Sequence, residues 1–332
     1  MLLDGDVYLT GMRHPLSGMR PLGDPSWQIQ FQTDKEYAQW SKVNIGWYWA
    51  RPTPAIREFF VRSQRWWNLN KREWDQSIMN DVRHNMVYSN ILEYPKTIML
   101  DPRDYRSTML FDWPDIFMSR SKIDAMNAAS VTVHYTMIYN QTKTLLAKQF
   151  GQWFDESYYT SAAWILQPIN IAGTKTEILD QIAFAVHLAR ATNRTFMWPN
   201  RVKLQCEWAS SLGGANFTPP ILIADFDRVS EVTPWVEGMY FRNRDRFTKA
   251  ELTRTYLSLN EAVDGSEPTL SSFFQMIRSV NTDVLTLDFD RLEMWKLRNS
   301  SSVRDAIREL GIVECVMCAH MERFSYFTSP IC

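Results

Sequence analysis

Two acidic residues, Asp4 and Asp6, stand near the start of the chain with Gly5 between them. Gly5 allows a tight turn, so both carboxylates can point oxygens at one hard divalent cation. Mg²⁺ or Mn²⁺ held in this way would neutralise a diphosphate group. The alternative is an ordinary Asp-Gly turn between strands, which is common for so short a pattern.

A histidine and three polar side chains further along the chain are candidates for the same chemistry. His134 ends the β-favouring run of residues 130–134, where a hydrogen-bonded core histidine is the commoner outcome and a ligand the rarer one. Asp75, Gln76 and Asn80 lie in a stretch with helical spacing, and Gln76 and Asn80 share one face. A solvated polar face is the simpler interpretation of these three residues.

The strands that would position these groups can be predicted from the hydrophobic pattern. An apolar run at residues 1–3 leads into the acidic turn. Residues 27–31 alternate as a strand that leads to Asp34, and residues 40–49 form a second strand-like run with an interruption near Gly46. We expect these strands to carry the acidic turn and its neighbours.

Two helices are predicted in the first half of the chain besides the one that holds Asn80. Thr53 is a typical N-cap followed by Pro54 at the first helical position, and this helix should run to about residue 67. Residues 140–154 form another helix after His134.

The pattern changes near residue 160, so we predict one domain over residues 1–160 and a second α/β domain over residues 161–332. The second domain opens with a strand, a helix that Thr174 and Glu177 can cap as a box, and another strand. Gly173 lies between strand and helix and could receive phosphate, but a single glycine favours a supporting domain.

Later elements of the second half are predicted from the same patterns. Strands are expected at residues 222–226 and 284–289, and helices at residues 249–259, 270–280 and 302–310. The overall fold class is therefore α/β.

Composition limits the classes of protein to which the chain can belong. The 332 residues are 45% hydrophobic and 14% aromatic, which is enough for a substantial core in each of two domains. The 36 basic and 37 acidic residues give a net charge of −1, so we expect no nucleic-acid partner.

The chain as given has no apolar run of about 18 residues and no N-terminal targeting segment, so we expect no membrane anchor in it. Three of its four cysteines fall in the last 18 residues, and the pair Cys315 and Cys318 has no partner motif for a zinc site. Disulfides or buried thiols are favoured over a metal site there.

The order of these pieces resembles a known family. The strand ending in DGD, then WQIQFQTD, NIGWYWARPTP, a helix, WDQSIMN and finally His134 with a lysine-bearing helix is similar to the nucleotide-diphospho-sugar transferase domain of family 77 glycosyltransferases. The resemblance covers roughly residues 1–157 and implies a GT-A fold, which is Rossmann-like.

The resemblance also implies roles for individual residues. Asp4, Asp6 and His134 would hold Mn²⁺ or Mg²⁺, and Asp75 or Gln76 would act in a transfer that retains the anomeric configuration. The remaining positions would bind donor or acceptor: Asp34, Asn44, Gly46, Asn80, Lys143 and Lys148.

One departure from the family concerns the start of the chain. In such domains the Asp-x-Asp turn follows a nucleotide-binding half of about 100 residues, whereas here it begins at residue 4. We therefore expect the chain to be an N-terminally truncated domain.

The second half narrows the resemblance. The run ILDQIAFAVHLARATNRTFMWPNRVKLQCEW, followed by PPILIADFDRVSEV, is similar to the C-terminal region of plant extensin arabinosyltransferases. This implies a UDP-sugar donor, a glycoprotein or polysaccharide acceptor, transfer of a pentose such as arabinofuranose, and work in the Golgi lumen.

Two other functions are weighed beside the transferase. The chain could be a non-catalytic remnant or glycan-binding protein of the same family. A hydrolase that uses Asp4, Asp6 and Asp75 is less favoured, because Asp4 and Asp6 are too close in sequence to flank one sugar.

Overall fold

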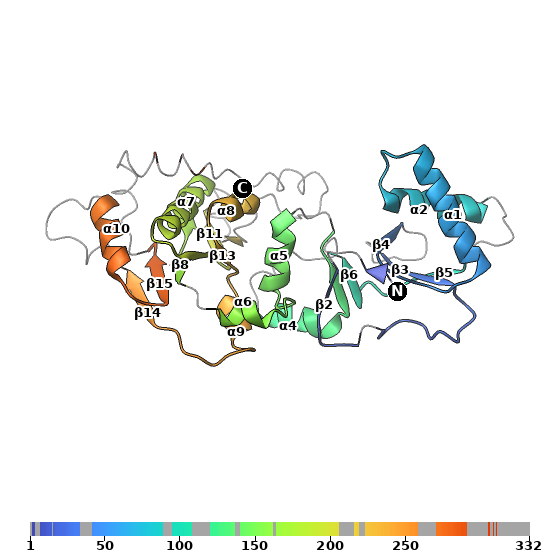
Figure 1. The fold of residues 1–332 in the computed structure, drawn as a ribbon, viewed down its shortest axis with the longest axis horizontal. Helices are drawn as coiled ribbons and strands as arrows, with labels where there is room; N and C mark the ends of the chain where they lie inside the picture. The colour runs from blue at the N-terminus through green and yellow to red at the C-terminus, as the bar shows by residue number, and fades with distance from the viewer. Residues whose placement is uncertain are drawn as a thin grey trace. The chain divides into compact units, whose positions relative to one another are not determined.

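The structure is a computed structural model that describes residues 2–3, 7–14, 16–33, 42–88, 95–107, 120–136, 140–161, 164–205, 216–218, 223–257 and 270–290, with residues 305, 308 and 310. It is a mixed α/β protein (Figure 1), as the sequence predicts. The chain divides into two compact units, of which the first comprises Met1–Asp112 and Ser121–Ile138, and the second Trp113–Arg120 and Tyr139–Cys332. Each unit is described by itself.

The first unit contains a four-stranded sheet with the strand order β1-β4-β3-β5. Its strands are β1 (Leu2–Leu3), β3 (Ile29–Thr33), β4 (Val43–Ala50) and β5 (Thr97–Met99). Strand β3 pairs with β4 in antiparallel register and with β5 in parallel register, and every residue of β3 is buried. The register of β3 against β4 shifts between Phe31 and Gln32, so this pair of strands carries a bulge.

Two helices cover this sheet, α1 (Pro54–Leu69) and α2 (Asp75–Tyr88) (Figure 1). The predicted N-cap of α1 is confirmed, because the Thr53 side chain accepts a hydrogen bond from the Ile56 backbone N–H. One hydrophobic core lies between sheet and helices, with these buried members: Ile29, Phe31, Val43, Ile56, Phe59, Met79, Val82 and Met86.

A second sheet of the first unit has the strand order β2-β7-β6. It consists of β2 (Val7–Leu9), β6 (Tyr105–Ser107) and β7 (Thr132–His134), and helix α4 (Arg120–Ala129) precedes β7. The predicted strand ending at His134 is thereby confirmed. A small cluster of buried side chains ties Trp47 of the first sheet to Tyr105 of the second, which brings β4 close to β7.

The second unit is built on a five-stranded sheet in which all described pairings are parallel, with the order β13-β10-β8-β15-β14. These strands are β8 (Ile165–Ile169), β10 (Thr195–Met197), β13 (Trp235–Val236), β14 (Arg254–Leu257) and β15 (Val284–Asp288). A three-stranded sheet, β9 (Ala172–Gly173), β11 (Val202–Leu204) and β12 (Asn216–Thr218), accompanies it.

Helix α7 (Lys175–Ala191) connects β8 to β10, packs against both and buries its apolar side chains (Figure 1). Its predicted capping box is confirmed, with Thr174 and Glu177 bonded reciprocally. The other helices of this unit are α5 (Asn140–Gln149), α6 (Glu156–Thr160), α8 (Phe226–Val232), α9 (Tyr240–Arg244) and α10 (Leu270–Ser279). Helices α5 and α6, which the sequence predictions assign to the first domain, belong to the second unit and contact α8 and α9.

Two predicted elements have the wrong type. Residues 222–226 were expected to form a strand, but Asp225 is the N-cap of helix α8, which begins at Phe226. Residues 249–259 were expected to be helical, but Arg254–Leu257 form β14 and pair in parallel with β15. The β-favouring Thr255 and Tyr256 fit a strand, and pairing with β15 outweighs the local helical spacing.

All four cysteines and most of the predicted helix at 302–310 lie outside the described residues. In the part of the chain that the structure describes, no helix is long and apolar enough to cross a membrane.

Candidate functional site

Gly46 on β4 and His134 at the end of β7 lie in direct contact between the two sheets of the first unit. A Cβ atom added to Gly46 would lie 2.1 Å from His134 Cε1 and 2.3 Å from its Nδ1. The imidazole therefore packs directly on the backbone of Gly46, and only glycine leaves room for it. The side chain of His134 is almost enclosed, with 4% of the residue surface exposed.

Gln32 on β3 holds the ring of His134 in one orientation. The Gln32 amide nitrogen donates hydrogen bonds to the carbonyls of Tyr105 (3.1 Å) and Arg106 (2.8 Å), so its Oε1 is left to accept. This oxygen lies 3.2 Å from His134 Nδ1. The arrangement places the ring proton on Nδ1 and the lone pair on Nε2, as in histidines that bind metals through Nε2.

The bulge in the first sheet is braced by two side chains from α2. Asn80 accepts a hydrogen bond from the backbone N–H of Val43 (2.7 Å) and donates to the carbonyls of Val43 (2.9 Å) and Gln76 (2.8 Å). The side-chain oxygen of Gln76 accepts from the backbone N–H of Ile45 (3.3 Å). These bonds replace ladder bonds that the bulge removes, and they set the path of the strand up to Gly46.

Asn44 completes this support, because its side-chain oxygen accepts a hydrogen bond from the Gly46 backbone N–H at 2.8 Å. The structure thus brings together Asn44, Gly46, Gln76, Asn80 and His134, which the sequence predicts as site residues. Gln76 and Asn80 share one helical face, as predicted. That face meets β4, and Asn80 is buried, so the interpretation of a solvated face is wrong for Asn80.

Asp75 differs from its neighbours because its side chain is exposed at the start of α2. Its carboxylate accepts a hydrogen bond from the Gln76 backbone N–H at 2.8 Å. Burial, with a smaller contribution from the charge of Asp75, raises the pKa of the Tyr48 hydroxyl above its ordinary value. Asp75 therefore lies within electrostatic range of β4 and remains open to solvent.

The acidic turn itself, Asp4 and Asp6, lies outside the described residues, as does Asp34. The strands that flank the turn in sequence do lie beside the histidine. Val7 pairs with His134 on β7, and Leu3 pairs with Trp47, the neighbour of Gly46 on β4. Both strands that adjoin the turn are thus tied to the contact between Gly46 and His134.

A divalent metal fits this neighbourhood through the chemistry of His134. Its Nδ1 contacts Gln32 Oε1 at 3.2 Å, so a metal bound by this ring would be held through Nε2. Among the described residues, no group of three or more His, Cys, Asp or Glu side chains is placed to hold a metal ion. A complete site in this unit would therefore need carboxylates from the undescribed turn.

A polar cavity of about 430 Å³ adjoins Asn80 at the start of α2. Trp74, Lys42 and Asp81 are among the residues that line it. Trp74 is 69% exposed, and Trp66 and Trp67 at the end of α1 are exposed as well. Flat aromatic faces beside charged and hydroxyl-bearing groups are suited to the apolar faces and hydroxyls of a sugar.

The two lysines predicted to bind phosphate lie on α5 in the second unit. Lys143 is half-buried, and its role stays a prediction. Lys148 is 7% exposed, and its ammonium lies over the rings of Tyr158 (3.5 Å), Trp235 (4.7 Å) and Trp153 (5.2 Å). Burial lowers its pKa to about 8, against the opposing charge of Glu237.

These aromatic rings surround the ammonium and satisfy it by cation–π contacts. Beside it, the fully buried carboxylate of Glu237 accepts hydrogen bonds from Tyr158 (2.9 Å), Tyr159 (3.0 Å) and Asn243 (3.1 Å). Such a polar network stabilises the interior of the second unit. These contacts give Lys148 a structural role, and its contact with phosphate stays a prediction.

Comparison with known families finds a similarity over the first part of the chain. Residues 1–146 match the family model for nucleotide-diphospho-sugar transferases. The matched region contains the contact between Gly46 and His134 and all the predicted site residues except Lys148. No curated protein and no solved structure matches the chain. The match supports a glycosyltransferase that uses a nucleotide-sugar donor.

Sequence reasoning did not single out Gln32, although it orients His134. The alternating pattern of β3 suggests a half-exposed strand, but every residue of β3 is buried, and a buried amide must have hydrogen-bonding partners. The sequence alone does not say which partners these are.

Proposed function

We propose that this protein is a metal-dependent, retaining glycosyltransferase of family 77 that moves a pentose, arabinofuranose, from a UDP-sugar to a glycoprotein or glycan acceptor. The observation that carries the proposal is the contact between Gly46 and His134 inside the matched transferase domain. A buried histidine with a fixed tautomer, beside strands that adjoin two carboxylates, is a built ligand position. Acceptors of this class are made in the Golgi lumen, where we expect the protein to act.

Asp4, Asp6 and His134 would hold Mn²⁺ or Mg²⁺. When bound, the cation would supply positive charge that stabilises the departing diphosphate. The role of the protein is to hold the ligands in place. Gln32 keeps the lone pair of His134 on Nε2, and the bonds from α2 keep Gly46 under the ring.

The exposed tryptophans and the polar cavity at the start of α2 support an acceptor site in the same unit. Trp74 would stack on a sugar ring, while Lys42 and Asp81 would meet its hydroxyls. Stacking and hydrogen-bond contacts of this kind orient the acceptor hydroxyl group without taking part in the chemistry.

Asp75 is the proposed catalytic carboxylate, because it is exposed near this cavity and close to Tyr48. Retention requires either a carboxylate nucleophile under the anomeric carbon or transfer on the same face as the leaving group. We place Gln76 beside Asp75 as a positioning residue, since its side chain is bonded to β4. An Asp75→Asn variant that keeps full transfer and stereochemistry would remove Asp75 from the reaction.

The metal site is tested by thermal unfolding of the purified chain with Mn²⁺, UDP or both, followed by transfer assays with a panel of UDP-sugars. We expect Mn²⁺ to raise the melting temperature and UDP to raise it further. His134→Ala should abolish both shifts, whereas His84→Ala, at an exposed position on α2, should keep them. An unchanged response of the His134→Ala protein would contradict the proposal.

The second candidate function is glycan binding without transfer, which the exposed Trp66, Trp67 and Trp74 of the first unit favour. In that case oligosaccharides would bind and Trp74→Ala would weaken them, while no UDP-sugar would turn over and Mn²⁺ would have no effect. Turnover that depends on Mn²⁺ decides for the transferase.

A further inference from the structure

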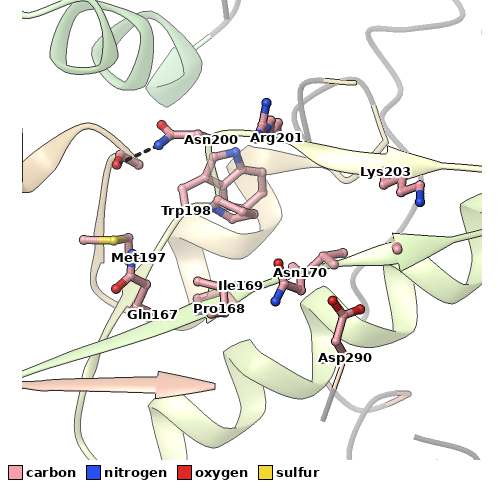
Figure 2. Close-up of a pocket in the computed structure, with 14 residues that line it drawn as sticks. Gln167, Pro168, Ile169, Asn170, Met197, Trp198, Asn200, Arg201, Lys203 and Asp290 are labelled. Carbon is pink, nitrogen blue, oxygen red and sulfur yellow. Dashed lines mark hydrogen bonds between the residues drawn. The ribbon is translucent and has the colours of Figure 1, made fainter. Parts of the chain in front are cut away.

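The second unit has a cavity of about 400 Å³ at the carboxyl ends of β8, β10, β13 and β15 (Figure 2). Its volume lies in the range of small-molecule sites. Segments that follow each of these strands contribute to the lining, among them Asn170, Trp198, Gly238 and Asp290. All the residues that line the cavity belong to the second unit.

The topology of the parallel sheet creates this crevice. Strand β8 lies in the middle, with β10 on one side and β15 on the other. The chain leaves β8 through α7 toward β10, while β15 comes from the later part of the chain. The connections diverge beside β8, and crevices at such switch points are where open parallel sheets bind ligands.

Two loops at this point are held in fixed conformations. Asn170 has a φ of 59°, in the left-handed region that non-glycine residues rarely adopt. Its side-chain nitrogen donates to the buried carboxylate of Asp288 at 2.8 Å, and the same carboxylate oxygen accepts from the Asp290 backbone N–H at 3.1 Å. Asp288 thus connects the loops after β8 and β15 by hydrogen bonds, and it holds Asn170 in its left-handed conformation at the wall of the cavity.

The loop after β10 is also preformed. Asn200 accepts a hydrogen bond from Gln149 (2.8 Å) and donates to the carbonyl of Gly238 (3.1 Å). A Cβ atom on Gly238 would lie 2.3 Å from the Asn200 side-chain oxygen, so the loops meet there only because Gly238 is glycine. Trp198 lies beside Asn200 in the wall and is 2% exposed. Among the described residues, its Nε1 is a buried donor without a hydrogen-bond partner.

The charges of the cavity are arranged for an anion next to hydroxyl groups. Arg201 and Lys203 are two residues apart along an extended segment, so they lie on the same side, opposite the buried Val202. In the view of Figure 2 they lie along the upper edge of the cavity, and Asp290 lies along the lower edge. The lining thus carries two cations and one anion.

The start of α7 does not take part in anion binding. The Glu177 carboxylate accepts a hydrogen bond from the Thr174 backbone N–H at 2.9 Å and lies against Gly173. This carboxylate occupies the position that a phosphate would need and repels a second anion. The basic side chains in the lining of this cavity are Arg201 and Lys203.

We propose that this cavity binds a small phosphorylated sugar, either a free sugar phosphate or the ribose phosphate part of a nucleotide. The phosphate lies between Arg201 and Lys203, and Asp290 accepts hydrogen bonds from sugar hydroxyls. Trp198 and Ile169 supply the apolar wall. The ligand chemistry follows from charge-assisted bonds to phosphate oxygens at one edge and a carboxylate acceptor at the other.

The test is isothermal titration of the full chain with ribose 5-phosphate, UMP, inorganic phosphate and uridine, all in EDTA. EDTA removes divalent cations, so the metal-dependent site of the first unit does not contribute. We expect ribose 5-phosphate and UMP to bind and uridine not to bind. Stronger binding of UMP than of ribose 5-phosphate identifies a nucleotide, and equal binding identifies a sugar phosphate.

Variants locate the binding. Arg201→Gln and Lys203→Gln should each weaken ribose 5-phosphate about tenfold, the size expected for one charge-assisted bond. Asp290→Asn should weaken ribose 5-phosphate and leave inorganic phosphate unchanged. Lys249→Gln, at an exposed position of the same unit, is the matched control and should bind as the parent does.

The proposal is overturned if neither phosphorylated probe binds in EDTA, or if binding persists unchanged in both the Arg201→Gln and Lys203→Gln proteins. Circular dichroism melts of each variant confirm that it is folded. A His134→Ala protein that keeps this binding but loses its response to Mn²⁺ and UDP separates the two sites, so that failure of one proposal does not imply failure of the other.

Discussion

Substitution of Gly46 by alanine tests the contact on which the candidate site is built. The new Cβ would lie 2.1 Å from His134 Cε1, whereas ordinary contacts between such atoms begin near 3.4 Å. The imidazole must retreat by about 1.3 Å, and a shift of that size breaks its hydrogen bond with Gln32. Gly46 is not among the glycines with positive φ, so the expected damage comes from crowding rather than from backbone strain.

The magnitude follows from three effects. Overpacking of a buried contact costs about 1–3 kcal/mol, and loss of the hydrogen bond between His134 and Gln32 costs about 1 kcal/mol. Alanine has less conformational freedom than glycine in the unfolded chain, which offsets about 0.4–1 kcal/mol of these costs. We therefore expect Gly46→Ala to lower the free energy of unfolding by about 1–4 kcal/mol.

A double-mutant cycle measured by urea unfolding separates this crowding from other causes. In a His134→Ala background the ring is absent, so Gly46→Ala should be neutral or slightly stabilising. Gly23→Ala is the matched control, because a Cβ at Gly23 meets no atom within 4 Å. Equal costs of Gly46→Ala in both backgrounds would refute the reasoning, since the cost would then have nothing to do with His134.

Two further predictions concern groups that the structure buries. The folded pKa of Lys148, about 8, lies below its unfolded value of 10.5. The folded state therefore binds fewer protons between these two values, and the free energy of unfolding should rise with pH across that window. Urea unfolding at pH 7.5 and pH 9.5 should show a rise that the Lys148→Met protein lacks, and a pH-independent difference between the two proteins would contradict the buried position. Asn80→Asp places a carboxylate oxygen against the carbonyls of Val43 and Gln76 and should lower the free energy of unfolding by about 3 kcal/mol. The control is Ser77→Asp on the exposed face of α2, which should be nearly neutral in the same assay. Equal costs of the two substitutions would argue against the bonds from Asn80.

Features that depend only on neighbouring residues could be predicted from the amino-acid sequence. Thr53 followed by Pro54 specifies a helix start, because the side-chain cap and the fixed φ act within one turn. Thr174 and Glu177 specify another start for the same reason. The alternation and β-branched residues around His134 specified its strand, and the mixture of such elements specified the α/β class.

Other features were decided by the tertiary structure alone, because they depend on residues far apart in the chain. Arg254–Leu257 became a strand because β15 offered a pairing edge. Lys148 was predicted to meet phosphate, yet its ammonium lies over the rings of Tyr158 and Trp235. Local spacing carries no information about such partners.

The candidate site shows the same division most clearly. The sequence identified Gly46, His134 and Asn80 as residues of interest, but it did not indicate that the ring packs on the glycine or that Gln32 selects its tautomer. Both properties arise where β3, β4 and β7 meet, since side chains more than 80 residues apart come within contact distance only after two sheets have packed together. Tertiary packing therefore decides whether His134 is a core residue or a ligand, and the amino-acid types decide only that it can be either.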